Sequence, residues 1–593
     1  MWNLRKSAII ATTAAAALGI LVLQNTAQPQ LAPAPPPMPE ALQKYQPVTA
    51  ERLKKPEDGN WLSIRRTYDG WGYSPLNQIT AANVTKLKPM WVLATGEGKV
   101  HESAPVVNNG VMFVTTPGNQ VIAIDVKSGN VLWRYRRARP TGAIVLHDTN
   151  RGVALYGNNV YFAAGEAVLV AIDAKTGREV WNTSVDDNSG GYYITLAPLI
   201  AGGKVMVGVS GGEVGIRGFV AAFDPETGKQ AWKTYTIPAP GEKGSETWPA
   251  GGDQWKTGGG PVWVTGNYDP DTNTAYWGTG NGGPWMGDKR PGDNLYISST
   301  IAVDVTTGAI KGHFQYDPNE SWDWDEVSPP ILIDYQRNGR TVKGLVDVAR
   351  DGYLWFLDRG TGGAIKFVEG KPYVYQNVYR SLDPVTGRPD VDPAHKPGSG
   401  KKADFCPSIH GGKNWPPIAY SPQTRMIYIP ANNNVCGTSE GALTVPYTRG
   451  KGYTGTVGFG AAAPQVPGAD HYGEVQAWNV DTGLKVWTHN YPKSPNWGAM
   501  LATAGGLVFS GGTADRKLHA FDAKSGKLLW EYPTSSGILA PPTSFTVDGK
   551  QYIAIESGWG GDSAGMQSTL NRMFPGEFPA VPEGGSVWVF GLE

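Results

Sequence analysis

Acidic and amide side chains in three short segments are the residue types of this sequence best suited to chemistry. Ser321–Asp325 places the carboxylates of Asp323 and Asp325 between tryptophans. In an extended segment both would point to one face, about 7 Å apart along the strand. Glu213 follows a strand-like apolar run, and Asn281 lies in a glycine-rich turn. Singly, each could be a turn residue. Together they predict one site for a cation that prefers hard oxygen ligands.

An internal repeat predicts the elements that hold these residues. The segment 123–133 reads AIDVKSGNVLW. Further copies, some degenerate, lie at residues 171–181, 222–232, 302–312, 356–366, 477–487 and 520–530. Alternating apolar residues run into an Asp-x-x-Ser/Thr-Gly turn, which predicts a β-hairpin. A strand–turn–strand pattern at Tyr420–Pro430 falls in the widest gap and brings the number of units to about eight.

Each unit would form a sheet that cannot bury both faces alone, so the units must stack radially with Ala and Trp at the seams. We therefore predict an all-β, eight-bladed β-propeller with tryptophan-docking repeats over residues 51–593, with a solenoid as the alternative. The composition agrees with this prediction. Gly accounts for 78 of 593 residues and Trp for 22, and only 18% of residues are charged. These values exclude a coiled coil and a disordered chain.

Charge balance limits the partners of this chain. Lys and Arg together number 52, as do Asp and Glu. No net field therefore attracts nucleic acid or an anionic membrane. A propeller by itself does not imply catalysis, since many propellers only bind other molecules.

The N-terminal segment indicates export. Arg5 and Lys6 precede the uncharged, largely apolar segment Ser7–Leu23, so residues 1–27 resemble a signal peptide. At ~1.5 Å per residue the apolar segment would extend about 26 Å, so an uncleaved membrane anchor is the alternative. Residues 28–50 are rich in proline and predict an extended leader outside the core. We expect a periplasmic protein.

The cysteines indicate a disulfide and a separate electron carrier. Cys406 and Cys436 are the only cysteines, and an even pair in an exported protein predicts a disulfide. A pair of buried thiols is the alternative. The sequence contains no Cys-x-x-Cys-His motif, so no c-type haem is attached to this chain.

From Trp61 to Phe590 the chain resembles the pyrroloquinoline quinone (PQQ)-dependent alcohol dehydrogenases of the methanol and ethanol dehydrogenase type. The stretches that carry the resemblance are Asn150–Gly152, Ser210–Gly218, Gly278–Trp285, Trp322-Asp323, Cys406-Pro-Ser, Gly412–Trp415, Trp497-Gly and Leu501–Gly505.

The resemblance implies roles for particular residues. Glu213, Asn281 and Asp323 match the metal ligands, and Asp323 also matches the catalytic base. The positions that match the cofactor-binding residues are Glu102, Arg151, Thr195, Ser210, Gly211, Gly212, Trp263, Arg350, Asn414, Trp415 and Trp497. A flat tricarboxylate quinone requires an aromatic floor, fixed donors and small residues that permit close approach, which suits these residue types.

The chain departs from the family pattern at several positions. Val145 and Leu146 stand where the family typically has two adjacent cysteines, which predicts an apolar roof without a ring disulfide. Pro261 replaces a frequent threonine, so a hydrogen bond to the cofactor is expected to be lost. Asp562 stands near a position that is often apolar or aromatic.

Asp325 resembles the extra acid of the lanthanide-dependent members. With Glu213 and Asp323 it supplies three negative charges, which suit a trivalent ion better than a divalent one. Calcium is the alternative metal. A solvated turn acid beside Glu326 is the alternative interpretation of Asp325.

The resemblance implies oxidation of a primary alcohol to an aldehyde. Asp323 would accept the hydroxyl proton, the metal would polarise the quinone carbonyl that receives hydride, and Arg350 would stabilise charge on the cofactor oxygens. Electrons would pass to a soluble cytochrome c, and a homodimer is left open.

Two alternative functions are compatible with the sequence. One is oxidation of a sugar, polyol or polymer alcohol in an aromatic pocket, suggested by Trp322, Trp324, Trp415 and Trp559. The other is a non-catalytic propeller that binds proteins on an exposed face.

Overall fold

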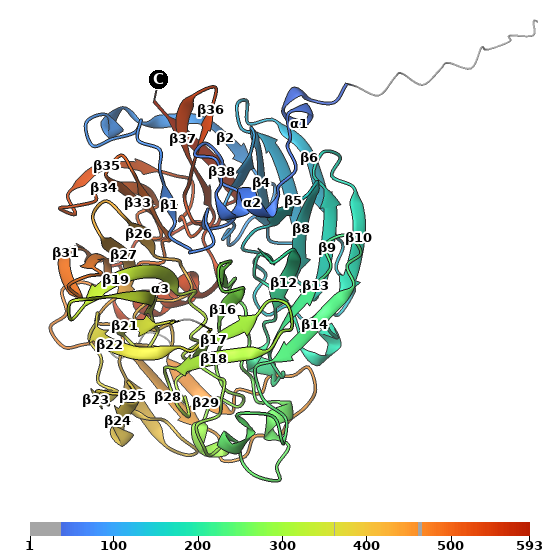
Figure 1. Ribbon diagram of the computed structural model, residues 1–593. Coiled ribbons are helices and arrows are strands. Elements are labelled where there is room, and N and C mark those ends of the chain that lie inside the picture. The colour runs from blue at the N-terminus through green and yellow to red at the C-terminus, as the bar shows by residue number, and fades with distance from the viewer. Residues whose placement is uncertain (1–36, 361, 461–464, 593) are drawn as a thin grey trace, which may run out of the picture. The chain divides into compact units, whose positions relative to one another are not determined.

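A computed structural model describes residues 37–360, 362–460 and 465–592 of the chain. The predicted signal peptide, residues 1–27, lies outside these ranges. The chain divides into two units, Met1–Pro39 and Glu40–Glu593, and the described helices and strands lie in the second unit. Strands dominate it, as predicted for an all-β protein (Figure 1). Within the described ranges, no helix has the length and apolar character needed to cross a membrane.

Most strands belong to four-stranded sheets. Four of them, each given in the spatial order of its strands, are β3 (Val106–Asn108), β4 (Val111–Thr116), β5 (Gln120–Asp125), β6 (Val131–Arg136); β7 (Ala154–Tyr156), β8 (Asn159–Ala164), β9 (Val168–Asp173), β10 (Glu179–Ser184); β11 (Leu199–Ala201), β12 (Lys204–Gly208), β13 (Phe219–Phe223), β14 (Gln230–Tyr235); and β15 (Asn267–Asp269), β16 (Thr274–Gly278), β17 (Ser299–Asp304), β18 (Ile310–Gln315). Two more are β19 (Ile331–Arg337), β20 (Arg340–Val348), β21 (Tyr353–Asp358), β22 (Lys366–Pro372); and β26 (Ala419–Ser421), β27 (Met426–Asn432), β30 (Gly473–Asn479), β31 (Leu484–Tyr491). Another combines strands from both ends of the chain, in the order β2 (Lys88–Ala94), β38 (Ser586–Gly591), β37 (Lys550–Ser557), β36 (Thr543–Val547).

The remaining strands form a larger sheet and smaller additions. The five-stranded sheet contains β1 (Tyr73–Ser74), β32 (Met500–Thr503), β33 (Leu507–Ser510), β34 (Lys517–Asp522) and β35 (Leu528–Pro533). The smaller sheets contain β23 (Tyr379–Leu382) and β24 (Pro389–Val391), and β25 (Lys402–Phe405), β28 (Gly437–Gly441) and β29 (Thr456–Gly460). The α-helices are α1 (Glu40–Gln43), α2 (Ala50–Lys54) and α3 (Gly561–Met573).

The repeat forms hairpins as predicted. In the first copy, β5 and β6 pair antiparallel around Asp125, whose Oδ1 accepts a hydrogen bond of 2.9 Å from the Lys127 amide. Nε1 of Trp133 then donates to the Ala174 carbonyl at 2.9 Å, in the next sheet along the chain. A Cβ on Gly177 would lie 2.7 Å from the Trp133 ring, so glycine lets the indole lie flat on the neighbouring turn.

The same contact recurs at other seams. The indole nitrogens of four further tryptophans donate to carbonyl oxygens of the following sheet, in the pairs Trp91 and Val126, Trp181 and Pro225, Trp232 and Val305, and Trp487 and Ala523. Each bond satisfies the polar end of a large apolar side chain, which is what a partly buried indole requires.

The predicted extra unit at Tyr420–Pro430 requires a correction. β26 and β27 do form the expected strand–turn–strand, but they share a sheet with β30 and β31, the hairpin around Asn479. They therefore complete a repeat already counted. A sheet without the motif is instead built from both ends of the chain, because β2 pairs antiparallel with β38. A search for consecutive copies cannot detect strands paired across the whole sequence.

The leader prediction is wrong for its second half. Leu42, Tyr45 and Val48 are buried, and the Val48 amide donates to Gly157 at 2.9 Å. The Tyr45 ring packs edge-on against Phe113. The prediction relied on proline content and did not weigh these three apolar residues, whose burial stabilises the packing of this segment against the first sheets. The compact unit accordingly begins at Glu40.

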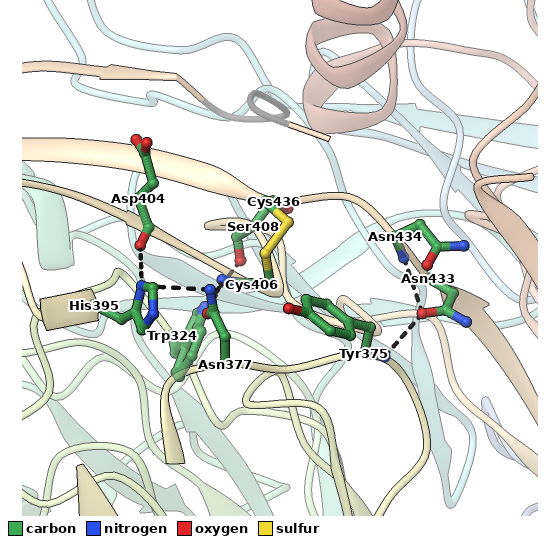
Figure 2. The surroundings of a disulfide bond; sticks show 10 residues. All are labelled: Trp324, Tyr375, Asn377, His395, Asp404, Cys406, Ser408, Asn433, Asn434 and Cys436. Carbon is green, nitrogen blue, oxygen red and sulfur yellow. Dashed lines mark hydrogen bonds between the residues drawn. A yellow bond between two sulfur atoms is a disulfide. The ribbon is translucent and has the colours of Figure 1, made fainter. Parts of the chain in front are cut away.

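The predicted disulfide between Cys406 and Cys436 is formed (Figure 2). It follows β25 and precedes β28, which pair antiparallel. Beyond it, the Ser408 carbonyl accepts a hydrogen bond of 2.9 Å from Nε1 of Trp324. The disulfide segment therefore supports the stretch that carries Asp323 and Asp325.

Candidate active site

A cavity of about 530 Å³ gathers most residues of the predicted site. The predicted residues that line it are Arg151, Thr195, Ser210, Gly211, Gly212, Glu213, Trp263, Asp323, Asp325 and Arg350. They come from loops at the ends of strands in several sheets, where backbone geometry is not restricted by the ladder.

The acidic segment 321–325 does not have the extended backbone that would place both carboxylates on one strand face. Asp323 has a φ of 66°, and the Asp325 amide donates to the Asp323 carbonyl at 3.2 Å, so the chain turns here. Both carboxylates still face the cavity. The intervening Trp324 is buried and stacks on Trp322, with ring centroids 4.8 Å apart. Packing of these two indoles, rather than strand alternation, orients the acids.

Three oxygens of the predicted metal ligands are buried without a hydrogen-bond partner. They are Oε2 of Glu213, Oδ1 of Asn281 and Oδ1 of Asp323. Unpaired buried oxygens are costly, and a cation would compensate them. Gly212 permits their approach, because a Cβ there would lie 2.2 Å from Asn281 Oδ1. The donor set therefore fits a hard cation.

Among the described residues, no group of three or more His, Cys, Asp or Glu side chains is arranged so that it could hold a metal ion. The predicted set includes the amide of Asn281, which is not one of these types. Asn281 is fully buried immediately behind the cavity wall, next to Asp325.

Asp325 differs from the other acids because it has partners. Its Oδ1 accepts a hydrogen bond of 2.6 Å from the backbone amide of Asn281. Its Oδ2 lies 3.3 Å from Nη2 of Arg350. The side chain is only 6% exposed. The alternative of a solvated turn acid is therefore wrong.

Burial and mutual repulsion perturb the acids of the site. Burial raises the pKa of Asp323 well above its ordinary value, the Asp325 charge raises this pKa further, and Arg350 opposes both effects. Burial also raises the pKa of Glu213 and of Asp325. A bound cation would stabilise the carboxylate forms and lower all three pKa values.

An aromatic and cationic cradle lies beside the acids. The Arg151 guanidinium sits 4.9 Å from the Trp263 ring centroid and 4.7 Å from that of Trp415. Arg151 also pairs with Glu102 at 2.9 Å. The Arg350 guanidinium lies 5.6 Å from the Trp263 ring. A planar anionic ligand fits such a site, since indole faces stack on it and guanidinium groups bind its carboxylates.

The remaining predicted cofactor residues lie one layer behind the cavity surface. Oδ1 of Asn414 accepts a hydrogen bond of 3.4 Å from Nη2 of Arg350. The Trp497 ring packs edge-on against His410, a cavity residue. Glu102 and Trp415 contact Arg151 from the same layer. These residues therefore contact cavity-lining side chains.

The aromatic wall proposed from Trp322, Trp324, Trp415 and Trp559 is wrong, because none of the four lines the cavity. Their indoles are buried in the core. The aromatic residues that line the cavity are instead Trp263, Trp285 and Phe459. The ring centroids of Trp285 and Phe459 lie 5.6 Å apart. These aromatic residues lie far apart in the sequence.

Other cavity residues had no predicted role. His147 faces the cavity directly after Val145 and Leu146, so the roof is not apolar. Helix α3 adds a further wall, and its residues on the cavity are Gly561, Asp562, Gly565, Ser568, Thr569 and Arg572. The helix has a weak apolar periodicity, so its sequence carried little signal.

Comparisons with known proteins agree with this fold and site. The family model for the PQQ-dependent glucose, ethanol and alcohol dehydrogenase β-propeller domain matches residues 61–381 and 491–553. The quinoprotein alcohol dehydrogenase PedH of Pseudomonas putida is 38% identical, covering 88% of this chain and 89% of PedH. A quinoprotein ethanol dehydrogenase of Pseudomonas aeruginosa is 36% identical, covering 88% of each chain.

Solved structures show the same likeness. A europium-containing methanol dehydrogenase superimposes with a TM-score of 0.84 at 34% identity, covering 91% of this chain and 99% of that one. The quinohemoprotein alcohol dehydrogenase of Comamonas testosteroni gives a TM-score of 0.82 at 32% identity, covering 93% and 83%.

Fold and site together define an all-β propeller oxidoreductase that acts on alcohols. The chain belongs to the PQQ-dependent quinoprotein alcohol dehydrogenase family.

Proposed function

We propose that this protein is a periplasmic dehydrogenase that oxidises primary alcohols to aldehydes with metal-bound PQQ. The observation that supports it best is the set of unpaired buried oxygens on Glu213, Asn281 and Asp323. Glu213 and Asp323 line the same cavity as Trp263, whose indole two arginines approach. A cation and a planar anion would each satisfy groups that are otherwise costly to bury.

We propose a lanthanide as the metal, with calcium as the alternative. Asp325 adds a third buried carboxylate beside Glu213 and Asp323, and a trivalent ion balances that charge better than a divalent one. The structural neighbour that contains europium supports the same choice.

In this proposal Asp323 accepts the hydroxyl proton of the substrate. Burial and the neighbouring Asp325 charge favour proton uptake by Asp323, and a bound cation would keep its side chain in the carboxylate form that receives the proton. Nη1 of Arg350 donates to the Asp323 carbonyl at 2.9 Å, which holds the acidic turn against the cradle. When bound, PQQ and the metal supply the electrophilic carbonyl that accepts hydride.

Further parts of the proposal concern the whole protein. The repeats form an eight-bladed, tryptophan-docked propeller, supported by the recurring indole-to-carbonyl bonds between consecutive sheets. Residues 1–27 direct export, and residues 28–39 link them to the compact unit. Electrons pass to a separate cytochrome c in this proposal. A homodimer is compatible with this arrangement.

The test is reconstitution of apoprotein with PQQ and either calcium or a light lanthanide, followed by dye-linked oxidation of short primary alcohols. Activity with the lanthanide alone supports the full proposal. Activity with calcium alone retains the enzyme and rejects the metal. Absence of activity and of bound PQQ with both metals would reject the proposed function.

A further inference from the structure

Helix α3 presents a charged carboxylate to the cavity. Asp562 lies in its first turn, where the helix dipole favours an anion. Burial opposes ionisation, but the charges of His147, Arg350 and Arg151, among others, lower the pKa of Asp562 below its ordinary value. The cavity is the one that Asp323 and Asp325 also line, so this carboxylate faces the space in which a substrate must sit.

Asp562 has no hydrogen-bond donor within the described part of the chain. Its partner is His147, whose Nδ1 lies 3.8 Å from Asp562 Oδ1. That distance is too long for a direct hydrogen bond. Both side chains are partly open to the cavity, at 42% and 34% exposure for His147 and Asp562. An ionised carboxylate and an imidazole thus lie side by side at the cavity, too far apart for a direct hydrogen bond but close enough for one polar atom in front of them to bridge both.

A hydroxyl group is the chemistry that can bridge this pair. Its oxygen can stand about 2.8 Å from both atoms, donating to the carboxylate. Because a hydroxyl both donates and accepts, it also satisfies Nδ1 of His147 in either protonation state. An ammonium group only donates, and an alkyl chain would leave both polar groups unsatisfied. The neighbouring hydroxyls of Ser568 and Thr569 continue the polar wall.

We propose that Asp562 and His147 bind a second hydroxyl group of the substrate, so that diols and polyols with a primary hydroxyl are preferred over simple alkanols. This inference rests on the proposed alcohol dehydrogenase function. It assigns Asp562 and His147 to substrate selection, while Asp323 remains the base.

The test compares holoenzyme reconstituted with PQQ and the active metal on propanol, the two propanediols and glycerol. For the wild type, kcat/KM should be higher for the best diol or glycerol than for propanol. In Asp562→Leu this ratio should fall about tenfold or more, mainly through KM, because a hydrogen bond to a charged group is lost. Asp562→Asn, which keeps a hydrogen-bonding group, should lose less.

Two further variants complete the experiment. Glu577→Gln removes an exposed acid just beyond α3 that does not line the cavity, and it should leave the ratio unchanged. His147→Phe should lower the ratio as Asp562→Leu does, and it carries the test if the leucine variant does not fold. An unchanged ratio in an enzyme that still oxidises propanol overturns the inference alone. A wild-type holoenzyme inactive on every alcohol overturns the inference together with the proposed function.

Discussion

The backbone amide of Asn281 donates a hydrogen bond of 2.6 Å to Oδ1 of Asp325. This bond ties the proposed extra acid to the proposed amide ligand. A Cβ on Gly280 would lie 2.1 Å from the same oxygen, so the turn before Asn281 must contain glycine for the two to meet. With Arg350 on its other oxygen, Asp325 is held at the site by its neighbours on both sides.

Asp325→Ala should selectively reduce activity supported by a lanthanide. The substitution removes one of three buried charges, so a trivalent ion loses more binding energy than a divalent one. Activity titrated with each metal in PQQ-loaded enzyme measures the effect. Asp325→Asn is the matched control for shape. Equal loss with calcium would mean that the residue only supports the Asn281 turn.

Asp323→Asn should lower kcat by about a hundredfold or more while PQQ stays bound, because the general base is removed. Asparagine tolerates the left-handed backbone of Asp323, which has a φ of 66°, so the turn should persist. Stopped-flow kinetics and the absorbance of bound quinone provide the two readouts. Retention of wild-type turnover would assign the base to another group.

Gly212→Ala should weaken metal binding. Its Cβ would lie 2.2 Å from Asn281 Oδ1, so the amide must turn away from the cavity. Metal content after dialysis against a chelator measures the loss. Gly452→Ala is the control, since a Cβ there meets no atom within 4 Å. Equal metal retention in both variants would place the cation elsewhere.

Replacement of both Cys406 and Cys436 by serine should lower the free energy of unfolding. The disulfide closes a loop between residues 30 positions apart. Loop-closure entropy for that size corresponds to about 3 to 4 kcal/mol. Urea denaturation of both proteins gives the difference. A midpoint equal to that of the wild type would show that the β25–β28 pairing holds this segment without the covalent link.

His471 should make stability depend on pH. Burial opposes its protonation, but hydrogen bonds of 2.6 Å to Glu474 and 2.5 Å to Asp470 raise the pKa of His471 above its ordinary value. The stabilisation is complete below the unfolded pKa of about 6.5 and is lost as pH rises through the higher folded pKa.

Tm should therefore fall as pH increases through that window. The His471→Gln variant keeps a donor for Glu474 but has no titrating group, so its Tm curve should be flatter there. Parallel curves for the two proteins would contradict the assignment.

The hairpins were predictable because their determinants are local. The carboxylate of Asp125 caps its own turn, and Gly129 supplies a φ of 74° four residues later. A similar turn at Asp383 was not predicted, because its strands are short and lack the tryptophan. The pairing of β2 with β38 could not be predicted, since no local pattern encodes a partner some 500 residues away.

Sequence alone determined the hairpin repeats, the cysteine pair and the set of acidic, amide and aromatic residues suited to a metal and a quinone. Those features depend on residue type and short spacing. Tertiary structure alone decided that the acidic segment turns, that Asp325 bonds to Asn281, and that α3 brings Asp562 to face His147. Such contacts depend on how distant segments pack, because a cavity is formed by side chains whose neighbours in space are not neighbours in the chain.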